Sequence, residues 1–239
     1  MKKTVLFLLL TVFALGVRAQ EDFLILNLGG NFSGMAFNKN DYGCKNHKMM
    51  KGGFIGGVRY QHQFGKPYLF ETALLYNESG FILDDIDQLE IYEYFPPEFQ
   101  EHPFDKINFK FNYMSVPLMF GYRFGWFDRK FSIAPKIGVQ LSYLTSSKMK
   151  YIYNCVDNKD AFDTDNKFDV AEVCEVEFSW IWGKRVCSFV GVTQRYSFTD
   201  LNSGDDTFIP ADMKMQNYQI SVSVGLRIKV NKMQKSFFD

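Results

Sequence analysis

The sequence predicts an all-β fold: an eight-stranded, antiparallel, up-and-down transmembrane β-barrel that follows an N-terminal signal peptide. Apolar and polar residues alternate along several long stretches, which is typical of strands with two different faces. Short and long connections also alternate strictly between these stretches. Aromatic residues make up 18% of the chain, yet its mean hydropathy is only −0.18, as expected when apolar residues alternate with polar ones.

The first 19 residues match a secretory signal peptide. A basic start at Lys2 and Lys3 precedes an apolar run at 4–17, and Ala19 is the expected cleavage position. The alternative is an uncleaved anchor helix, but the run is shorter than the ~20 residues that a spanning helix needs. We therefore divide the chain into a signal peptide (1–19), a barrel domain (20–230) and a C-terminal periplasmic tail (231–239).

The charge balance argues against nucleic acid as a partner. Residues 1–19 hold Lys2, Lys3 and Arg18 but no acidic residue, so the rest of the chain has 24 basic and 27 acidic residues. Proteins that bind nucleic acid normally carry a basic face.

The alternating segments predict eight strands, each long enough for the ~9–11 residues of a tilted membrane-spanning strand. We expect these strands at 24–34, 51–64, 67–82, 110–125, 129–146, 167–182, 185–200 and 215–230.

The connections between these strands are of two kinds. Tight turns at 65–67, 126–129 and 183–184 alternate with long connections at 35–50, 83–109, 147–166 and 201–214. Outer-membrane barrels have short periplasmic turns and long extracellular loops. The sequence therefore predicts an outer-membrane barrel with both termini on the periplasmic side.

The two rows of each strand indicate which face meets lipid. In the segment 110–125, Leu118 and Phe120 share a row of large apolar residues, whereas Ser115 and Gly121 share the other. An eight-stranded barrel has room inside only for filling side chains or one small ligand. We expect the large residues to face lipid; the alternative is a soluble, lipocalin-like carrier with them inside. Glu172 interrupts the outward row of 167–182, so it lies above the bilayer or the register there slips by one residue.

Several segments, taken in order, resemble the PorT-like family of outer-membrane β-barrels from Gram-negative bacteria. They are "KGGFIGGVRYQHQF" and "KPYLFETALLYNESGF" within 51–81, "FNYMSVPLMFGYRFG" at 111–125, "FSIAPKIGVQLSYLTSSK" at 131–148 and "RYSFTDLN" at 195–202. The resemblance implies the barrel fold, an outer-membrane location and, for the named member, a link to secretion and surface motility. The chain departs from the pattern at 231–239, because it does not stop on an aromatic at the end of the last strand.

Charged residues in the inward rows are candidates for a functional lumen. We expect them to pair across strands and fill the lumen, for example Arg59 with Glu71; the alternative is a polar channel. The predicted network comprises Arg59, Glu71, Arg123, Lys136, Glu175, Glu177, Arg195 and Arg227.

A long acidic connection at 84–106 is the candidate docking loop. Function often sits on such loops above a rigid scaffold. Alternatives are divalent-cation binding and a plain solvated loop. Its acidic residues are Asp84, Asp85, Asp87, Glu90, Glu93, Glu98, Glu101 and Asp105.

Cysteine and histidine give weaker signals. Cys44 and Cys155 both fall in expected outer loops, where a disulfide is one alternative and free thiols the other. Cys174 and Cys187 face opposite ways on neighbouring strands, so we expect free thiols. Neither a metal site nor a cofactor site is predicted. The histidines, which form no hydrolase-like constellation with Ser and an acid, are His47, His62 and His102.

The sequence thus predicts a non-enzymatic, monomeric outer-membrane barrel with a plugged lumen. We expect it to act as a scaffold or docking component of an envelope assembly, in contact with membrane lipid and with a protein partner through its extracellular loops. The alternatives are a lipid-modifying enzyme at the outer rim and the soluble lipocalin-like periplasmic carrier.

Overall fold

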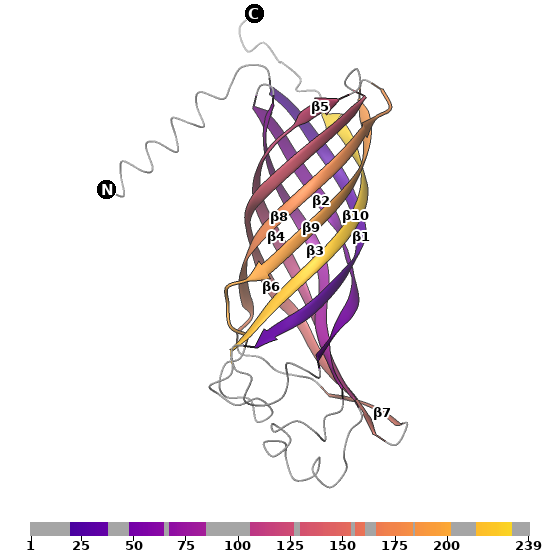
Figure 1. The fold of residues 1–239 in the computed structure, drawn as a ribbon, viewed down its shortest axis with the longest axis vertical. Coiled ribbons are helices and arrows are strands. Elements are labelled where there is room, and N and C mark those ends of the chain that lie inside the picture. Colours follow the sequence, from indigo (N-terminus) through magenta and orange to yellow (C-terminus); the bar gives the residue numbers. More distant parts are fainter. Residues whose placement is uncertain are drawn as a thin grey trace, which may run out of the picture.

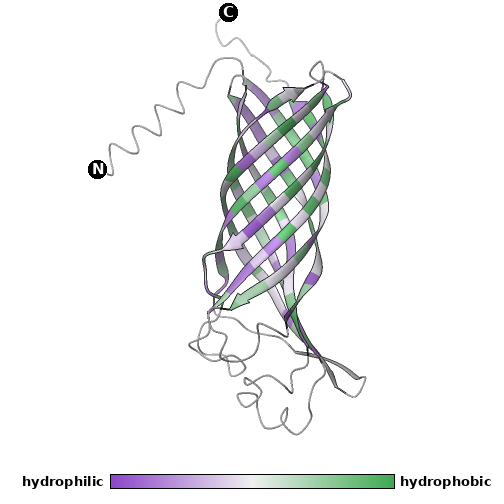
Figure 2. Ribbon diagram, in the orientation of Figure 1, coloured by the Kyte–Doolittle hydropathy of each residue, from purple (hydrophilic) through white to green (hydrophobic). Residues whose placement is uncertain are grey.

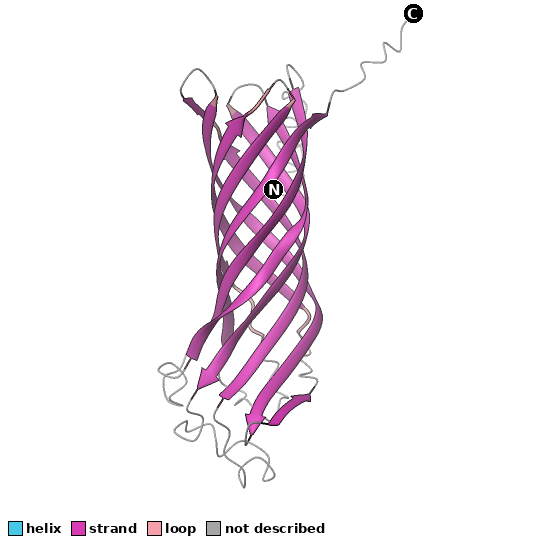
Figure 3. Ribbon diagram, turned by 90° about the vertical axis from the view of Figure 1, so that its right-hand side faces the viewer, coloured by secondary structure: helices cyan, strands magenta, loops and turns pink. Residues whose placement is uncertain are grey.

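The computed structural model consists of β-strands joined by turns and connections (Figure 3). No helix among the described residues is long and apolar enough to cross a bilayer. The residues that the structure describes are 20–37, 48–64, 67–84, 106–126, 130–153, 156–160, 166–183, 185–201 and 214–230. The predicted signal peptide and C-terminal tail lie outside these ranges.

The strands form one closed antiparallel barrel, a ring of 8 strands as predicted (Figure 1). Going round the ring, the order is β4-β3-β2-β1-β10-β9-β8-β6, and β6 pairs with β4 to close it. The strands are β1 (Gln20–Phe37), β2 (Lys48–Phe64), β3 (Tyr68–Asp84), β4 (Lys106–Tyr122), β5 (Phe124–Trp126), β6 (Phe131–Tyr153), β7 (Val156–Asp160), β8 (Phe168–Ile181), β9 (Val186–Ser197) and β10 (Met215–Val230).

Two short strands extend the ring without adding a member to it. β5 continues β4 beyond Arg123 and pairs with the start of β6. β7 folds back on the last residues of β6, from Met149 to Tyr153. We call the end where β2 meets β3 the short-turn end, and the opposite end, where β7 lies, the long-connection end (Figure 1).

Five strands are longer than the sequence predicted, namely β1, β2, β3, β4 and β6. Parts of the expected connections 83–109 and 147–166 are strand, because β3, β4 and β6 go on pairing with one another. Asp84 pairs with Lys106, and Lys106 in turn pairs with Ile152. The placing of Asp84 in a loop was therefore wrong: it ends β3, and its carboxylate lies 3.5 Å from the Lys106 ammonium.

The predicted faces of the strands are confirmed. Leu118 and Phe120 are exposed on the outer wall, whereas Ser115 is buried inside. Ile137 and Val222 are also exposed, which contradicts the soluble-carrier alternative. The register of β8 does not slip, since Glu172 points outward opposite Val139 and Tyr196. Figure 2 shows the resulting alternation of apolar and polar residues along the strands.

Inward-facing glycines let the strands pass close to one another. A Cβ atom on Gly225 would lie 2.2 Å from the carbonyl oxygen of Leu26 and 2.4 Å from the ring of Phe189. A backbone oxygen cannot move aside as a flexible side chain can. A side chain at Gly225 would therefore force β1 and β10 apart.

Replacing Gly225 by Ala should lower the free energy of unfolding by about 1–3 kcal/mol, the usual cost of overpacking. The matched control is Gly125→Ala, because nothing lies within 4 Å of a Cβ there. Urea unfolding in lipid vesicles, followed by tryptophan fluorescence, measures both. Equal losses in the two variants would contradict the steric explanation.

Candidate functional site

The lumen brings seven of the eight predicted inward charges into one connected network near the short-turn end. Its centre is Lys136 on β6, whose Nζ atom lies 2.6 Å from Glu71, 2.9 Å from Glu175 and 2.8 Å from Glu177. The side chains of Lys136, Glu71 and Glu177 are 0% exposed. One ammonium group thus joins carboxylates from β3 and β8 to β6.

Two arginines flank this centre. Arg59 on β2 donates to Glu71 at 2.9 Å and to Glu175 at 2.8 Å. Arg227 on β10 donates to Glu177 on the other side of Lys136. Gln61 and Thr193 also donate to Glu71 and Glu175, respectively, at 3.0 Å. The carboxylates are therefore surrounded by donors, which a buried charge requires.

Arg123 is held more loosely at the edge of the network. Its guanidinium lies 3.7 Å from the Glu177 carboxylate and donates to Gln61 at 2.7 Å and to Gln63 at 3.3 Å. Its side chain is 13% exposed, whereas Glu177 is fully buried. Arg123 therefore stands between the charged centre and the short-turn mouth.

Arg195 lies apart from the other seven predicted charges. It pairs with Asp169, which also accepts from Ser197, and its guanidinium carbon lies 5.7 Å from the centroid of the Tyr113 ring. Sequence reasoning missed Asp169 because it lies close to the start of its strand. Its position in the sequence could have identified it as an inward-facing charge, since it shares the inward row of β8 with Glu175 and Glu177.

Neutral amides are bonded to one another in the middle of the lumen. Asn77 donates to Gln219 at 2.9 Å, and Gln219 donates back to Asn77 at 2.9 Å. Asn31 donates to Asn77 at 3.1 Å, and Ser79 donates to Asn217 at 3.0 Å. These bonds connect strands on different sides of the ring, so this layer is also occupied by side chains.

The long-connection end of the lumen is apolar, which the sequence analysis did not predict. Phe81 stacks on Phe109 with ring centroids 4.5 Å apart and planes at 9°, and Phe111 lies 6.4 Å from Phe81. These three rings are buried, as are Met35 and Met215. Aromatic and aliphatic side chains therefore line the lumen beyond the amides.

The outer face of the barrel changes from apolar to polar residues where the lumen changes from amides to apolar side chains. Tyr76, Met114, Tyr143 and Phe168 are successive register partners across β3, β4, β6 and β8. On the short-turn side of this row the outer face is mainly apolar, as at Leu118 and Phe120, with the exposed Glu172 of β8 as an exception.

Beyond the row the outer face is polar. Lys110 bonds Glu78 at 2.5 Å on this part of the wall, and Lys148 is exposed. Apolar outside and polar inside suits lipid, and the reverse suits water. The row therefore marks the edge of the lipid-facing wall, and β3, β4 and β6 continue past it.

Aromatic side chains also gather on the outer face at the short-turn end. Tyr68 and Tyr122 make an edge contact with centroids 5.4 Å apart, and Trp180 stacks on Trp182 at 5.7 Å. Such rings form the girdles of membrane barrels at the two lipid–water boundaries. The lipid-facing wall thus has aromatic rings at both edges.

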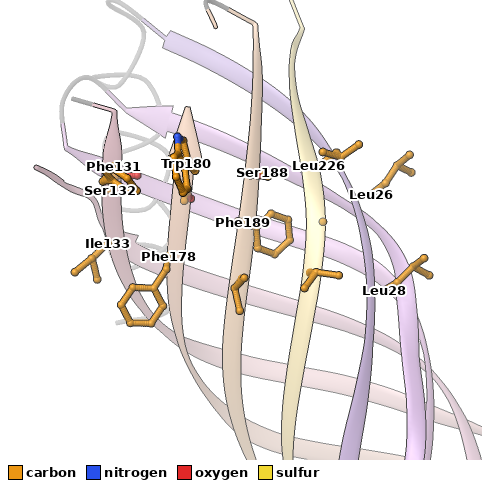
Figure 4. Close-up of a pocket in the computed structure, with 14 residues that line it drawn as sticks. Leu26, Leu28, Phe131, Ser132, Ile133, Phe178, Trp180, Ser188, Phe189 and Leu226 are labelled. Carbon is orange, nitrogen blue, oxygen red and sulfur yellow. The ribbon is translucent and has the colours of Figure 1, made fainter. Parts of the chain in front are cut away.

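A hollow of about 860 Å³ on this wall lies over β1, β10, β9, β8 and β6 near the short-turn end. Leu26, Leu28 and Leu226 flank it on one side, and Phe178 and Trp180 on the other (Figure 4). Its 14 lining residues include no titratable group. Such a surface accommodates hydrocarbon but offers no acid, base or metal ligand.

The remaining predicted residues take no part in the charge network. Cys174 is exposed on the outer wall and Cys187 is buried, both as free thiols. His62 lies 2.6 Å from Asp22, to which Tyr60 also donates at 2.8 Å. No group of three metal-binding side chains occurs in the described part of the chain. Outside the described residues lie Cys44, Cys155, His47, His102, Asp85, Asp87, Glu90, Glu93, Glu98, Glu101 and Asp105.

A family model described as "Outer membrane protein beta-barrel domain" matches residues 19–238. The chain belongs to this family. Its members are outer-membrane barrels, so the protein is located in the outer membrane. No curated protein sequence matches the chain.

Solved outer-membrane barrels have a similar fold. A major outer membrane protein of Thermus thermophilus is 11% identical, with a TM-score of 0.49 over 87% of this chain and 99% of the other. Neisserial surface protein A is 12% identical, with a TM-score of 0.41 over 87% and 97%. Ail, the attachment invasion locus protein of Yersinia pestis, is 11% identical, with a TM-score of 0.39 over 87% and 99%.

Replacing Lys136 by Met should lower the free energy of unfolding by about 3–5 kcal/mol, because buried carboxylates lose their shared partner. The control Lys148→Met should change little, since Lys148 makes no ion pair with another described residue. Urea unfolding in vesicles measures both variants, and an unchanged midpoint in Lys136→Met would contradict the role of the charge.

Proposed function

We propose that this outer-membrane barrel is a PorT-like, non-enzymatic scaffold whose lumen is plugged by its own side chains. Its role would be to dock a protein partner of an envelope assembly, such as a secretion system, at the long-connection end. The observation that carries the proposal is the network centred on Lys136, which connects opposite sides of the ring through direct bonds.

The succession of layers in the lumen supports a plug rather than a channel. Charged groups around Lys136, amides around Asn77 and rings around Phe109 follow one another along the axis. Open aqueous pores are typical of about 16–18 strands, whereas eight-stranded barrels are filled by side chains. A filled barrel transmits neither ions nor solutes, so its function would lie on its surfaces.

The prolonged wall supports docking at the long-connection end. β3 and β4, which hold the two ends of the acidic connection 85–105, extend beyond the lipid-facing surface together with β6. Pairs such as Asp84–Lys106 and Glu78–Lys110 hold the base of this connection. We place this end outside the cell and the short-turn end in the periplasm, as the signal peptide at 1–19 and the pattern of connections predict.

The plug predicts the absence of a steady ionic current. The purified barrel, reconstituted in a planar lipid bilayer, should give the same baseline as the bilayer alone, because bonded side chains occupy the lumen at every layer. A known open porin in the same bilayer provides the positive control. Reproducible stepwise currents from the wild-type protein would contradict the plug.

Deleting 85–105 should abolish covalent crosslinks to an envelope protein in intact cells while the barrel still folds. The deletion keeps Asp84 and Lys106, so the ends of β3 and β4 stay paired. Deleting the connection 203–212 is the matched control. Mass spectrometry identifies the crosslinked products, and heat-modifiable migration in gels verifies folding. If both deletions leave the crosslinks unchanged, docking through the acidic connection is wrong.

A further inference from the structure

A second hollow lies inside the barrel, at its short-turn mouth. It has a volume of about 440 Å³, within the range of small-molecule sites. Four of its lining residues are basic, namely Arg123, Arg185, Arg227 and Lys229, and one is acidic, Glu21. Since Glu21 pairs with Lys229 at 2.6 Å, it leaves the three arginines uncompensated by any carboxylate of the lining.

The charges buried next to this pocket do not balance. The connected network holds four cations, Arg59, Arg123, Lys136 and Arg227, against three carboxylates, Glu71, Glu175 and Glu177. Every one of these side chains is at most 13% exposed. An excess charge inside a low-dielectric barrel is costly without a counter-ion. The pocket adjoins two members of the network, Arg123 and Arg227.

One arginine of the lining also keeps unused capacity to donate hydrogen bonds. Arg185 is exposed at the mouth, and its side chain forms no hydrogen bond or ion pair with another described residue. The pocket therefore combines positive charge with hydrogen-bond donors that are available to bind an anion.

Part of the lining is apolar. Phe23 is 7% exposed, and the Arg227 guanidinium carbon lies 5.6 Å from the centroid of its ring. Ile181 and Pro67 also line the pocket. An inorganic anion would leave these surfaces unused, whereas an anion with an apolar body would cover them.

We propose that this mouth pocket binds a small organic anion, with its carboxylate beside Arg123 and Arg185 and its apolar group against Phe23. The anion supplies the negative charge that the network lacks. This site is separate from the proposed docking surface, which lies at the opposite end of the barrel.

Cys187 provides a built-in probe of the pocket, because it is part of the lining and 9% exposed. The experiment uses the full-length barrel in lipid nanodiscs, with Cys44, Cys155 and Cys174 replaced by Ser. A methanethiosulfonate carrying a sulfonate should label Cys187 at least about tenfold faster than one carrying a quaternary ammonium, since a cationic cleft concentrates anions. Benzoate should slow the labelling, and methyl benzoate, which lacks the charge, should not.

Two variants test the arginines directly. Arg185→Gln should reduce the rate ratio of the two reagents without affecting folding, because this exposed side chain forms no hydrogen bond or ion pair with another described residue. Arg123→Gln should reduce both the ratio and the protection by benzoate. Lys148→Gln, at the other end of the barrel, is the matched control and should change neither.

Several outcomes would overturn the proposal. Equal labelling rates without protection by benzoate would refute an anion site. Protection by inorganic phosphate as strong as that by benzoate would refute the apolar half of the ligand. If neither reagent labels Cys187, calorimetric titration of the wild-type barrel with benzoate decides, and the lack of a saturable heat would refute the site.

Discussion

The structure depends on one constraint: hydrocarbon offers no hydrogen bonds, so every backbone group that crosses it must be bonded within the protein. The pairing of β4 with β6 and of β1 with β10 meets this constraint by leaving no open edge on the ring. Closure also divides each strand into an outer row, which meets lipid, and an inner row, which meets a narrow lumen. The distribution of residue types follows from this division.

Within the lumen, the same isolation from water makes charge pairing the dominant interaction. Lys136 contacts carboxylates from two other strands, and Arg59 and Arg227 enclose them. Because these residues come from five strands, the network forms only when the ring is complete. It therefore stabilises the closed barrel as a whole rather than any single hairpin.

The sequence predicted the ring and the inward rows because alternation depends only on neighbouring residues. It could not predict that Lys136 meets Glu71, since contacts across the lumen depend on how far the strands are staggered around the ring. It also missed the strand residues 106–109 and 147–153. There the pattern reverses, with Phe109 inside and Lys148 outside, so an analysis that expected apolar residues outside took them for connections.

The extension of β3, β4 and β6 beyond the row of Tyr76 and Tyr143 has a geometric consequence. β3, β4 and β6 are neighbours in the ring, so the wall of the barrel is higher on one side of the long-connection end than on the other (Figure 1). A molecule that binds against this higher wall can approach it from one side of the barrel only. The shape of the protein would then determine how the bound molecule is oriented in the plane of the membrane, as well as its height above the membrane.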